Sequence, residues 1–470
     1  MQETILNLVA KANAYLSDYI LIILLVGVGL FYSFKTKFVQ VRCFGEGMKK
    51  VFGNLKLKGD KNSSGLSSFQ ALATAIAAQV GTGNIVGASG AILVGGPGAI
   101  FWMWVIAFLG MATIYAEAVL AQETKIKDAD GEVHGGPVYY IKKAFPNGFG
   151  TFLAVFFAIA TVLALGFMGS MVQSNSIAES CNNAFGVPVW AIGVVVAVIA
   201  AFIFLGGIQR IASVTEKLVP FMAGVFLLGG VVILCIKIKF VPQTIAMIFK
   251  CAFTPDSLIG GGIGYALKTA ISQGAKRGLF SNEAGMGSTP HAHAMANVEK
   301  PHDQGVAAMI GVFIDTFVVL TMTALVVITC LYTGNGPLAN LSGDAYITAT
   351  SGETAIVAKT TAMQTAVSSA LPWGNFGSIF VAVCLLFFAF STILSWNFFG
   401  KLNIQYLFKN KKCATVIYSV IAIAFIFLGS ILKNDIVWEL TDFFNYLMVI
   451  PNAIALFALS KLVTKNSKNK

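Results

Sequence analysis

The sequence contains few charged residues. Asp, Glu, Lys and Arg make up only 11% of its 470 residues, whereas hydrophobic residues make up 56%. A soluble globular domain typically carries about 25% charged residues, so this composition excludes a soluble domain with a polar surface. The mean hydropathy of +0.78 is typical of a chain that crosses a bilayer many times. We therefore expect an all-α integral membrane protein.

Several other features are missing from the sequence. The seven cysteines are scattered, without a CxxC pair or metal-ligand spacing, which argues against a disulfide framework. No long linker separates soluble domains, and no cleavable leader is recognisable before the first apolar segment. We therefore expect a single membrane bundle that keeps its N-terminus.

Motifs for catalysis or cofactor binding are also missing. The stretch GTGNIVG is one residue too long for a dinucleotide fingerprint, and no nucleophile elbow is present. His291 and His293 are two positions apart and would point to different sides of a helix, and His134 and His302 are expected in loops. Zinc chemistry is therefore not expected. The sequence predicts neither an enzyme nor a cofactor.

Eleven segments are candidates for crossing a bilayer as helices, for which about 20 apolar residues are needed. They are residues 19–34, 68–94, 99–121, 152–172, 187–207, 219–238, 258–287, 306–331, 377–399, 414–432 and 437–459. The seventh segment includes polar side chains such as Lys268, Arg277 and Glu283, which are costly in contact with lipid. We expect this segment to cross the membrane shielded inside the protein.

The distribution of Lys and Arg supports this topology, because short basic loops stay in the cytoplasm. With the N-terminus outside, one side collects Lys300 and the basic residues of segments 35–61, 125–143, 210–217, 401–412 and 461–470. Without the seventh span, the last two clusters would lie outside. We expect a multi-pass plasma-membrane protein of bacterial inner-membrane type with a cytoplasmic C-terminus. Basic loops beside anionic lipid then explain the net charge of +11, without nucleic-acid binding.

Two of the spans are interrupted by glycine and polar residues. The interruptions are QVGTGNIVGASG, residues 79–90, and AKRGLFSNEAGMGS, residues 275–288. Such a break exposes backbone groups and is tolerated in a membrane only where it lines a cavity or binds a ligand. Without the first span, the broken spans are the first and sixth of ten, so the two five-span halves must be inverted. Broken helices at corresponding positions of inverted halves indicate the binding site of a transporter.

This pattern also predicts how the chain is organised. Residues 1–66 would form an extra helix and a basic loop, residues 67–240 the first repeat, and residues 241–470 the second repeat with a basic tail. We also expect an interfacial helix near residues 139–145 and a loosely amphipathic helix around residues 356–367.

Four stretches of the sequence resemble the alanine or glycine:cation symporter family, also called the sodium:alanine symporters. They are GTGNIVG (81–87), GGPGAIFWMW (95–104), DADGEVHGGPVYYI (128–141) and GLFSNEAGMGSTPHAHA (278–294). The resemblance implies a leucine-transporter-type fold of two inverted five-helix repeats plus one extra helix. It also implies sodium-driven uptake of a small neutral amino acid, with sodium as the coupling ion and no other cofactor.

The resemblance places the amino acid between the two breaks. Its carboxylate would face backbone N–H groups around Thr82 and Gly83, with Gln79 and Asn84 nearby, and its ammonium would face Phe280, Ser281 and Asn282. Phe167, Phe280, Met286 and Trp396 would line the pocket and leave room for alanine or glycine. Sodium would be held by carbonyl groups of the first broken helix, at Gly81, and by the hydroxyls of Ser391 and Thr392.

Three carboxylates within the predicted spans leave alternatives open. Glu117 is predicted to form an inner-gate ion pair with Arg210 or Lys276, and Asp315 is a candidate proton or cation ligand. Each could also belong to a buried polar network, and the role of Glu283 is open. Proton-coupled uptake, with Asp315 or Glu117 as the proton carrier, is therefore the alternative to sodium coupling, and a channel is less favoured. No obligatory protein partner is evident; the expected partners are the amino acid, sodium and membrane lipid.

Overall fold

The computed structural model describes residues 2–53, 66–127, 133–254, 263–351, 355–371 and 373–468. Eight continuous helical segments in this part of the chain are long and apolar enough to cross a membrane. They are Leu6–Lys35, α7 (Ala99–Thr124), Gly148–Phe185, α12 (Gly207–Ile236), Pro301–Leu331, α21 (Phe376–Leu407), α22 (Lys412–Ile431) and α23 (Asn434–Ala458).

Three of these segments change helix type along their length. The first contains α1 (Gln2–Tyr15), η1 (Leu16–Leu21) and α2 (Ile22–Lys35). The third contains α9 (Gly148–Thr161), η3 (Val162–Gly169) and α10 (Ser170–Phe185), and the fifth contains α17 (Pro301–Val312), η5 (Phe313–Leu320) and α18 (Thr321–Leu331). The segments η1, η3 and η5 are π-helical.

A ninth span is broken. It consists of α5 (Ser68–Gln79) followed by η2 (Gly83–Gly87) and α6 (Ala88–Gly95), and its two halves differ in direction by 43°. The eleven predicted spans would add α11 (Val189–Phe204), which is short, and α15 (Ile263–Asn282), which is polar. The total of eleven stays a prediction.

The remaining elements are short. They are α3 (Val39–Arg42), α4 (Phe44–Phe52), α8 (Pro137–Ala144), η4 (Ile238–Phe240), α13 (Val241–Phe253), α16 (Pro290–Met295), α19 (Gly343–Thr350), α20 (Ala362–Ala370) and α24 (Ser460–Lys468). Strands β1 (Ile126–Lys127) and β2 (Val133–His134) form an antiparallel hairpin in which Ile126 pairs with His134.

Burial separates central helices from peripheral ones. In the apolar 18-residue stretch of α7, 72% of the residues are buried inside the protein, whereas in the corresponding stretches of α12 and α22 only 28% are buried. A helix that is apolar all round and buried on one side only has an apolar outer face suited to lipid. α7 packs against α15, α17 and α2, whereas α22 packs against α10 and α11. The core therefore lies around α7 and the broken span.

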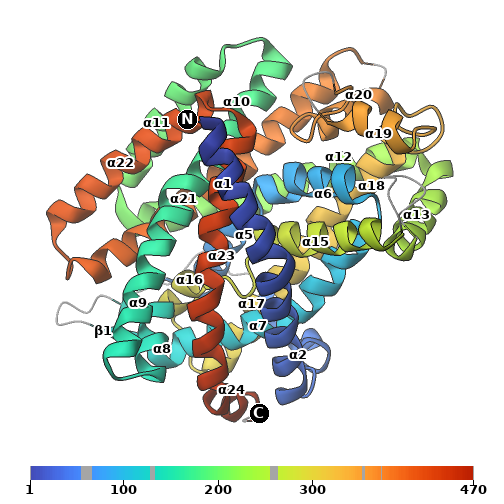
Figure 1. The fold of residues 1–470 in the computed structure, drawn as a ribbon. Coiled ribbons are helices and arrows are strands. Elements are labelled where there is room, and N and C mark those ends of the chain that lie inside the picture. Colours follow the sequence, from blue (N-terminus) through green and yellow to red (C-terminus); the bar gives the residue numbers. More distant parts are fainter. Residues whose placement is uncertain are drawn as a thin grey trace.

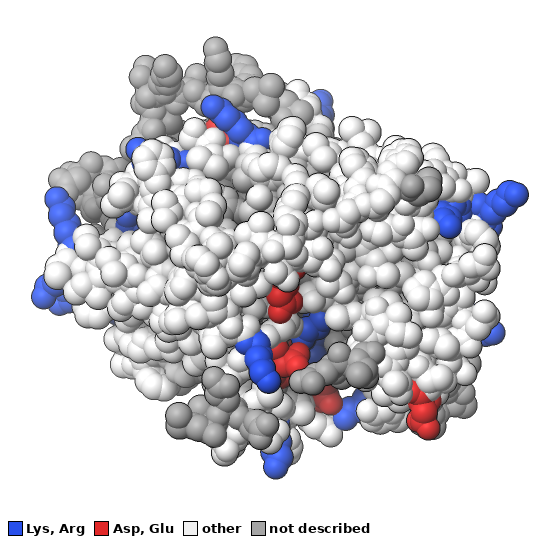
Figure 2. Space-filling view, turned by 90° about the horizontal axis from the view of Figure 1, so that it is seen from above, with Lys and Arg blue, Asp and Glu red and all other residues white. Residues whose placement is uncertain are grey.

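Figure 1 shows the helices as one bundle, with the red α23 running beside the blue α1 and α2. α1 begins near the top of this view and α24 ends near the bottom. Seen from above, the surface is mostly uncharged, and a mixed group of acidic and basic side chains lies near its middle (Figure 2).

Three local predictions can be compared with the structure. The helix expected near residues 139–145 is confirmed as α8. The helix expected around residues 356–367 begins only at Ala362, because the preceding stretch turns inward and Val357 donates its N–H to the Ala349 carbonyl. The loop prediction for His302 is wrong, since Pro301 starts α17 and His302 follows it.

Candidate functional site

The first break separates α5 from η2. The N–H of Gly81 donates to Oδ1 of Asn84 at 3.1 Å, and the N–H of Thr82 donates to Oε1 of Gln173 at 3.1 Å. These two side-chain oxygens satisfy backbone donors that the interrupted helix leaves open. Asn84 follows the break in η2, whereas Gln173 comes from α10 and was not among the predicted residues. Both side chains are buried.

The second break follows α15. Glu283, Gly285 and Gly287 have φ angles of 57°, 93° and 81° before α16 begins at Pro290. Positive φ is readily adopted by glycine but is strained for glutamate. The carboxylate of Glu283 accepts hydrogen bonds from Nε1 of Trp396, at 2.5 Å, and from the hydroxyl of Ser288. The Trp396 bond holds the strained turn against α21, and the Ser288 bond closes the turn on itself.

The two breaks touch each other. Nε2 of Gln79 donates to the carbonyl of Asn282 at 2.7 Å. A Cβ added to Gly83 would lie 3.0 Å from Cα of Ser281 and 3.1 Å from the ring of Phe280. Glycine is therefore needed at position 83 for the two backbones to approach so closely. The structure thus brings together the predicted residues of both interrupted spans.

Asp315 links both breaks from a third helix. Its carboxylate accepts hydrogen bonds from Nδ2 of Asn84 at 2.6 Å, from Ser281 Oγ at 2.9 Å and from Thr316 Oγ1 at 2.8 Å. Nδ2 of Asn282 donates to Thr316 Oγ1 at 3.3 Å. Asp315 is fully buried, so three donors compensate for the loss of its hydration.

A cluster of neutral oxygen atoms lies where α21 passes the end of α5. Thr392 Oγ1 lies 2.8 Å from the Ala77 carbonyl and 3.5 Å from the Val80 carbonyl, and Ser391 Oγ lies 3.5 Å from the Ala77 carbonyl. Both hydroxyls also donate to the Phe388 carbonyl one turn earlier, at 3.1 and 2.9 Å.

Gly81 contributes to this cluster by its small size. Its carbonyl accepts the N–H of Asn84, and the α5-end carbonyls found near the two hydroxyls are those of Ala77 and Val80. A Cβ at Gly81 would lie 2.4 Å from Thr392 Oγ1 and would close the space beside the hydroxyl. The sequence could have indicated these two carbonyls, because they lie at the end of a half-helix, where backbone carbonyls lack hydrogen-bond partners within the helix.

Aromatic rings form one wall beside the breaks. The ring of Phe280 lies 5.8 Å from Trp396 and 4.8 Å from Trp438, measured between centroids. The guanidinium of Arg277 lies 4.7 Å from the Trp438 ring and forms an ion pair with Asp442 at 3.0 Å. Trp438 and Asp442 were not among the predicted residues. Both lie on α23, far along the chain from either break.

The other two predicted wall residues differ in their surroundings. Met286 is buried within the second break, and its N–H donates to the Glu283 carbonyl. Phe167, in η3, stacks on Phe425 at 4.9 Å and contacts Tyr418 at 5.6 Å, both in α22. Its described ring contacts therefore do not join it to Phe280 or Trp396.

The predicted ion pair of Glu117 is wrong. Its carboxylate accepts hydrogen bonds from Nδ2 of Asn452 at 2.6 Å and from the N–H of Gly285 at 3.3 Å. Lys276 instead pairs with Asp18 at 3.6 Å, and Arg210 donates to the Phe202 carbonyl. Glu117 is fully buried in α7, where the turning backbone of the second break supplies a nearer donor than either cation.

Groups at the end of α7 hold the segment that follows the second break. Nε2 of Gln122 donates to the carbonyls of His293 and Ala296, at 2.5 and 3.0 Å, and the Lys125 ammonium donates to the Ala296 carbonyl at 2.8 Å. Burial and the neighbouring Lys127 ammonium lower the pKa of Lys125 from its ordinary value. These bonds tie the C-terminus of α16 to α7.

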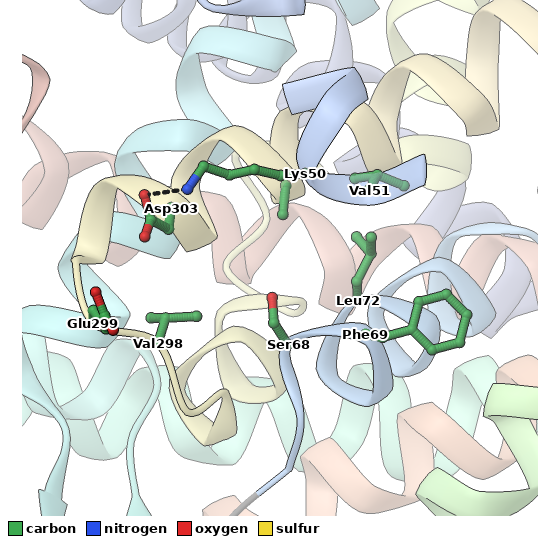
Figure 3. A pocket seen from close by; sticks show the side chains of 9 residues that line it. Lys50, Val51, Ser68, Phe69, Leu72, Val298, Glu299 and Asp303 are labelled. Carbon is green, nitrogen blue, oxygen red and sulfur yellow. Dashed lines mark ion pairs between the residues drawn. The ribbon is translucent and has the colours of Figure 1, made fainter. Parts of the chain in front are cut away.

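A cavity of about 210 Å³ lies beside the start of α5. Figure 3 shows Ser68, Phe69 and Leu72 of α5 on one side, with the ion pair between Lys50 and Asp303 across it. The ammonium of Lys50 lies 2.6 Å from the Asp303 carboxylate. The cavity therefore lies between α5 and the contact of α4 with α17.

Interrupted helices of this kind are features from which the binding sites of ion-coupled transporters are built. The profile of the sodium:alanine symporter family matches residues 2–469. The chain belongs to the sodium:alanine symporter family. Its members and relatives are transporters, so the protein is a multi-pass membrane transporter and not an enzyme.

Curated relatives extend over nearly the whole chain. The sodium/alanine symporter AgcS of Methanococcus maripaludis is 38% identical over 98% of this chain and 96% of its own length. The putative sodium/proton-dependent alanine carrier protein YrbD of Bacillus subtilis is 40% identical over 97% of this chain and 90% of its own. The probable sodium/glutamine symporter GlnT of Bacillus subtilis is 38% identical, with coverages of 98% and 90%.

The fold has a solved counterpart. The crystal structure of MhsT in complex with L-phenylalanine superposes with a TM-score of 0.59, over 87% of this chain and 97% of that chain, at 14% sequence identity. The family member described here therefore has a leucine-transporter-type fold. Together with the family match, this supports a sodium-coupled amino-acid transporter.

Proposed function

We propose that the protein imports a small neutral amino acid, alanine or glycine, together with sodium by alternating access. The observation that carries the proposal is the oxygen cluster formed by the carbonyls of Ala77 and Val80 and the hydroxyls of Ser391 and Thr392. Neutral hydroxyl and carbonyl oxygens suit a hard monovalent cation, because they can replace its hydration shell. The names of the relatives, two of which specify sodium with alanine or glutamine, support the same coupling ion.

The amino acid would bind where the two breaks meet. Thr82 Oγ1 and Gln79 Oε1 are buried and have no hydrogen-bond partner among the described atoms. Buried polar atoms normally have partners, so an incoming ligand is a reasonable occupant. The Thr82 hydroxyl can donate to a carboxylate, and the Gln79 oxygen can accept from an ammonium.

The residues around the meeting point of the two breaks favour an amino acid with a small side chain. Phe280, Trp396 and Met286 are buried, and Gly83 lies directly against the backbone of Ser281. A larger side chain on the ligand would have to displace these groups, and overpacking typically costs about 1–3 kcal/mol. Alanine and glycine fit this restriction better than glutamine.

Asp315 favours a second candidate, proton coupling. Its buried carboxylate connects Asn84 in the first broken span with Ser281 in the second, so a change in its charge would affect both breaks. One relative is named a sodium/proton-dependent carrier. A passive channel is less favoured, because broken helices at corresponding positions of two repeats are typical of alternating-access transporters.

Uptake into proteoliposomes tests the proposal. Purified protein is given radiolabelled alanine, glycine or glutamine under an inward sodium gradient, with equal potassium as the control, and a proton gradient is applied separately. Accumulation of alanine or glycine above equilibrium only with sodium is the expected result. Accumulation driven by protons alone would move the coupling to Asp315, and equilibration without accumulation would identify a passive pore.

The division into repeats is part of the same proposal. An extra helix and basic loop would occupy residues 1–66, and the inverted repeats residues 67–240 and 241–470. The interrupted span α5–α6 would then correspond to α15–α16. The basic loops would face the cytoplasm of a bacterial-type plasma membrane, with the N-terminus outside.

A further inference from the structure

A cluster of three metal-ligating side chains lies apart from the transport site. Cys43, Glu46 and His302 each offer one ligand atom, and these atoms lie within 4.8 Å of one another. Nε2 of His302 is 3.3 Å from Oε1 of Glu46. Cys43 lies between α3 and α4, Glu46 in the first turn of α4, and His302 at the start of α17.

Close packing holds the two helices that carry these side chains. A Cβ added to Gly47 would lie 2.7 Å from Cγ1 of Ile310 and 2.9 Å from the Val306 carbonyl. Only glycine lets α4 approach α17 so closely. Lys50, one turn after Glu46 in α4, forms an ion pair with Asp303, the residue after His302 in α17, and so joins the same two helices (Figure 3). The cluster is therefore positioned by the fold before any ion arrives.

The imidazole of His302 is oriented for coordination. Its Nδ1 is 2.7 Å from the hydroxyl of Tyr115 in α7. Its Nε2 makes no hydrogen bond in the described part of the chain, although the residue is only 5% exposed. Histidine ligands of metals are usually held in this way, with one ring nitrogen bonded to a neighbouring group and the other directed at the metal. A buried ring nitrogen without a hydrogen bond is the second, independent sign of a ligand here.

We propose that Cys43, Glu46 and His302 bind a zinc ion that joins α4 to α17. Zinc is bound by thiolate, imidazole and carboxylate ligands, and one thiolate and one carboxylate would balance its charge of +2. Tetrahedral zinc with N and O ligands at about 2.0–2.1 Å places those two atoms about 3.3 Å apart, which matches the separation of His302 and Glu46. The fourth position is left for water.

This site is distinct from the sodium cluster in chemistry. A thiolate and an imidazole are soft or borderline ligands that select zinc over sodium, magnesium or calcium, whereas Ala77, Val80, Ser391 and Thr392 offer oxygen only. The metal site also does not depend on the identity of the transported amino acid. Loss of sodium-driven uptake would leave the zinc proposal intact, and loss of zinc binding would leave the transport proposal intact.

Cobalt titration tests the site directly. Full-length protein carrying Cys235→Ser and Cys413→Ser, which remove the two exposed thiols, is stripped with a chelator and titrated with Co²⁺. We expect one equivalent to bind, with a thiolate-to-cobalt charge-transfer band that Zn²⁺ abolishes by displacement. Cys43→Ser should abolish the band, and Glu46→Gln and His302→Gln should each weaken Zn²⁺ binding at least tenfold.

Matched controls separate loss of a ligand from loss of folding. Cys330→Ser and His134→Gln change the same residue types elsewhere and should retain the band. Thermal unfolding supplies an independent readout, since Zn²⁺ should raise the Tm of the parent protein but not that of Glu46→Gln. Glu46 is partly exposed, so this variant should fold. A charge-transfer band that survives in Cys43→Ser, no stoichiometric binding, or an equal Tm shift in parent and Glu46→Gln would overturn the proposal.

Discussion

The hydroxyl of Thr392 has the most direct connection to the proposed sodium position. It lies within 3.5 Å of carbonyls from both Ala77 and Val80. Thr392→Ala removes one of the four oxygen ligands proposed for the ion, and the alanine methyl group cannot replace it. The sodium concentration for half-maximal alanine uptake should therefore rise at least about tenfold, as measured in proteoliposomes at saturating alanine.

Two further variants serve as controls for this measurement. Thr392→Ser keeps the hydroxyl and should restore most of the sodium affinity. Thr161→Ala removes a buried threonine whose described bond is to its own helix, at the Phe157 carbonyl, and should leave sodium dependence unchanged. An unaltered sodium requirement in Thr392→Ala would remove Thr392 from the coupling site.

Asn84 connects the first break to the buried carboxylate. Its amide accepts from the Gly81 N–H and donates to Asp315. Asn84→Ala leaves both of these buried groups with one partner fewer, at a cost of about 1–3 kcal/mol. We expect alanine to bind about tenfold more weakly in equilibrium binding at saturating sodium. Asn182→Ala, an amide near the end of α10 that bonds to the Val187 carbonyl, is the control, and wild-type affinity in Asn84→Ala would separate Asn84 from the substrate.

The two interrupted helices were recognisable in the sequence because glycine and polar residues are costly within an apolar span. Their partners were not recognisable. Gln173, Trp438 and Asn452 contact the breaks from α10 and α23, and no local pattern distinguishes them from other polar or aromatic residues. The ion pair predicted for Glu117 failed for the same reason, because sequence spacing could not show that the second break turns back onto α7.

The contact between the two interrupted helices can be tested at Gly83. Gly83→Ala adds a Cβ at 3.0 Å from Cα of Ser281, which forces α5–η2 and the end of α15 apart. Overpacking of this kind costs about 1–3 kcal/mol, so sodium-driven alanine uptake should fall about tenfold or more. Gly224→Ala, in α12, is the matched control because a Cβ there meets nothing within 4 Å. Equal uptake by both variants would contradict close contact during transport.

The orientation of the bundle in the membrane is a prediction from the basic loops. α22 runs from Lys412 to Ile431, and the Lys-rich side before it should be cytoplasmic. In a background without other cysteines, Cys413 should therefore resist a membrane-impermeant maleimide in right-side-out vesicles. A cysteine placed by Lys433→Cys should react under the same conditions.

Permeabilised vesicles serve as the control for both positions, since each cysteine should then react. Labelling of Cys413 but not of Lys433→Cys in sealed vesicles would invert the predicted topology. It would also place the cavity beside Ser68, and the proposed zinc site near it, on the outside of the cell.

Composition and local pattern by themselves determined the class of the protein, most of its spans and the positions of both helix breaks. These properties are local, because apolar length sets membrane insertion and glycine weakens a helix where it stands. Only the tertiary structure decided which groups meet: the Ala77 and Val80 carbonyls with Thr392, Asp315 with both breaks, and Cys43 and Glu46 with His302. Such contacts join residues far apart in the chain, and they depend on how the helices pack around α7.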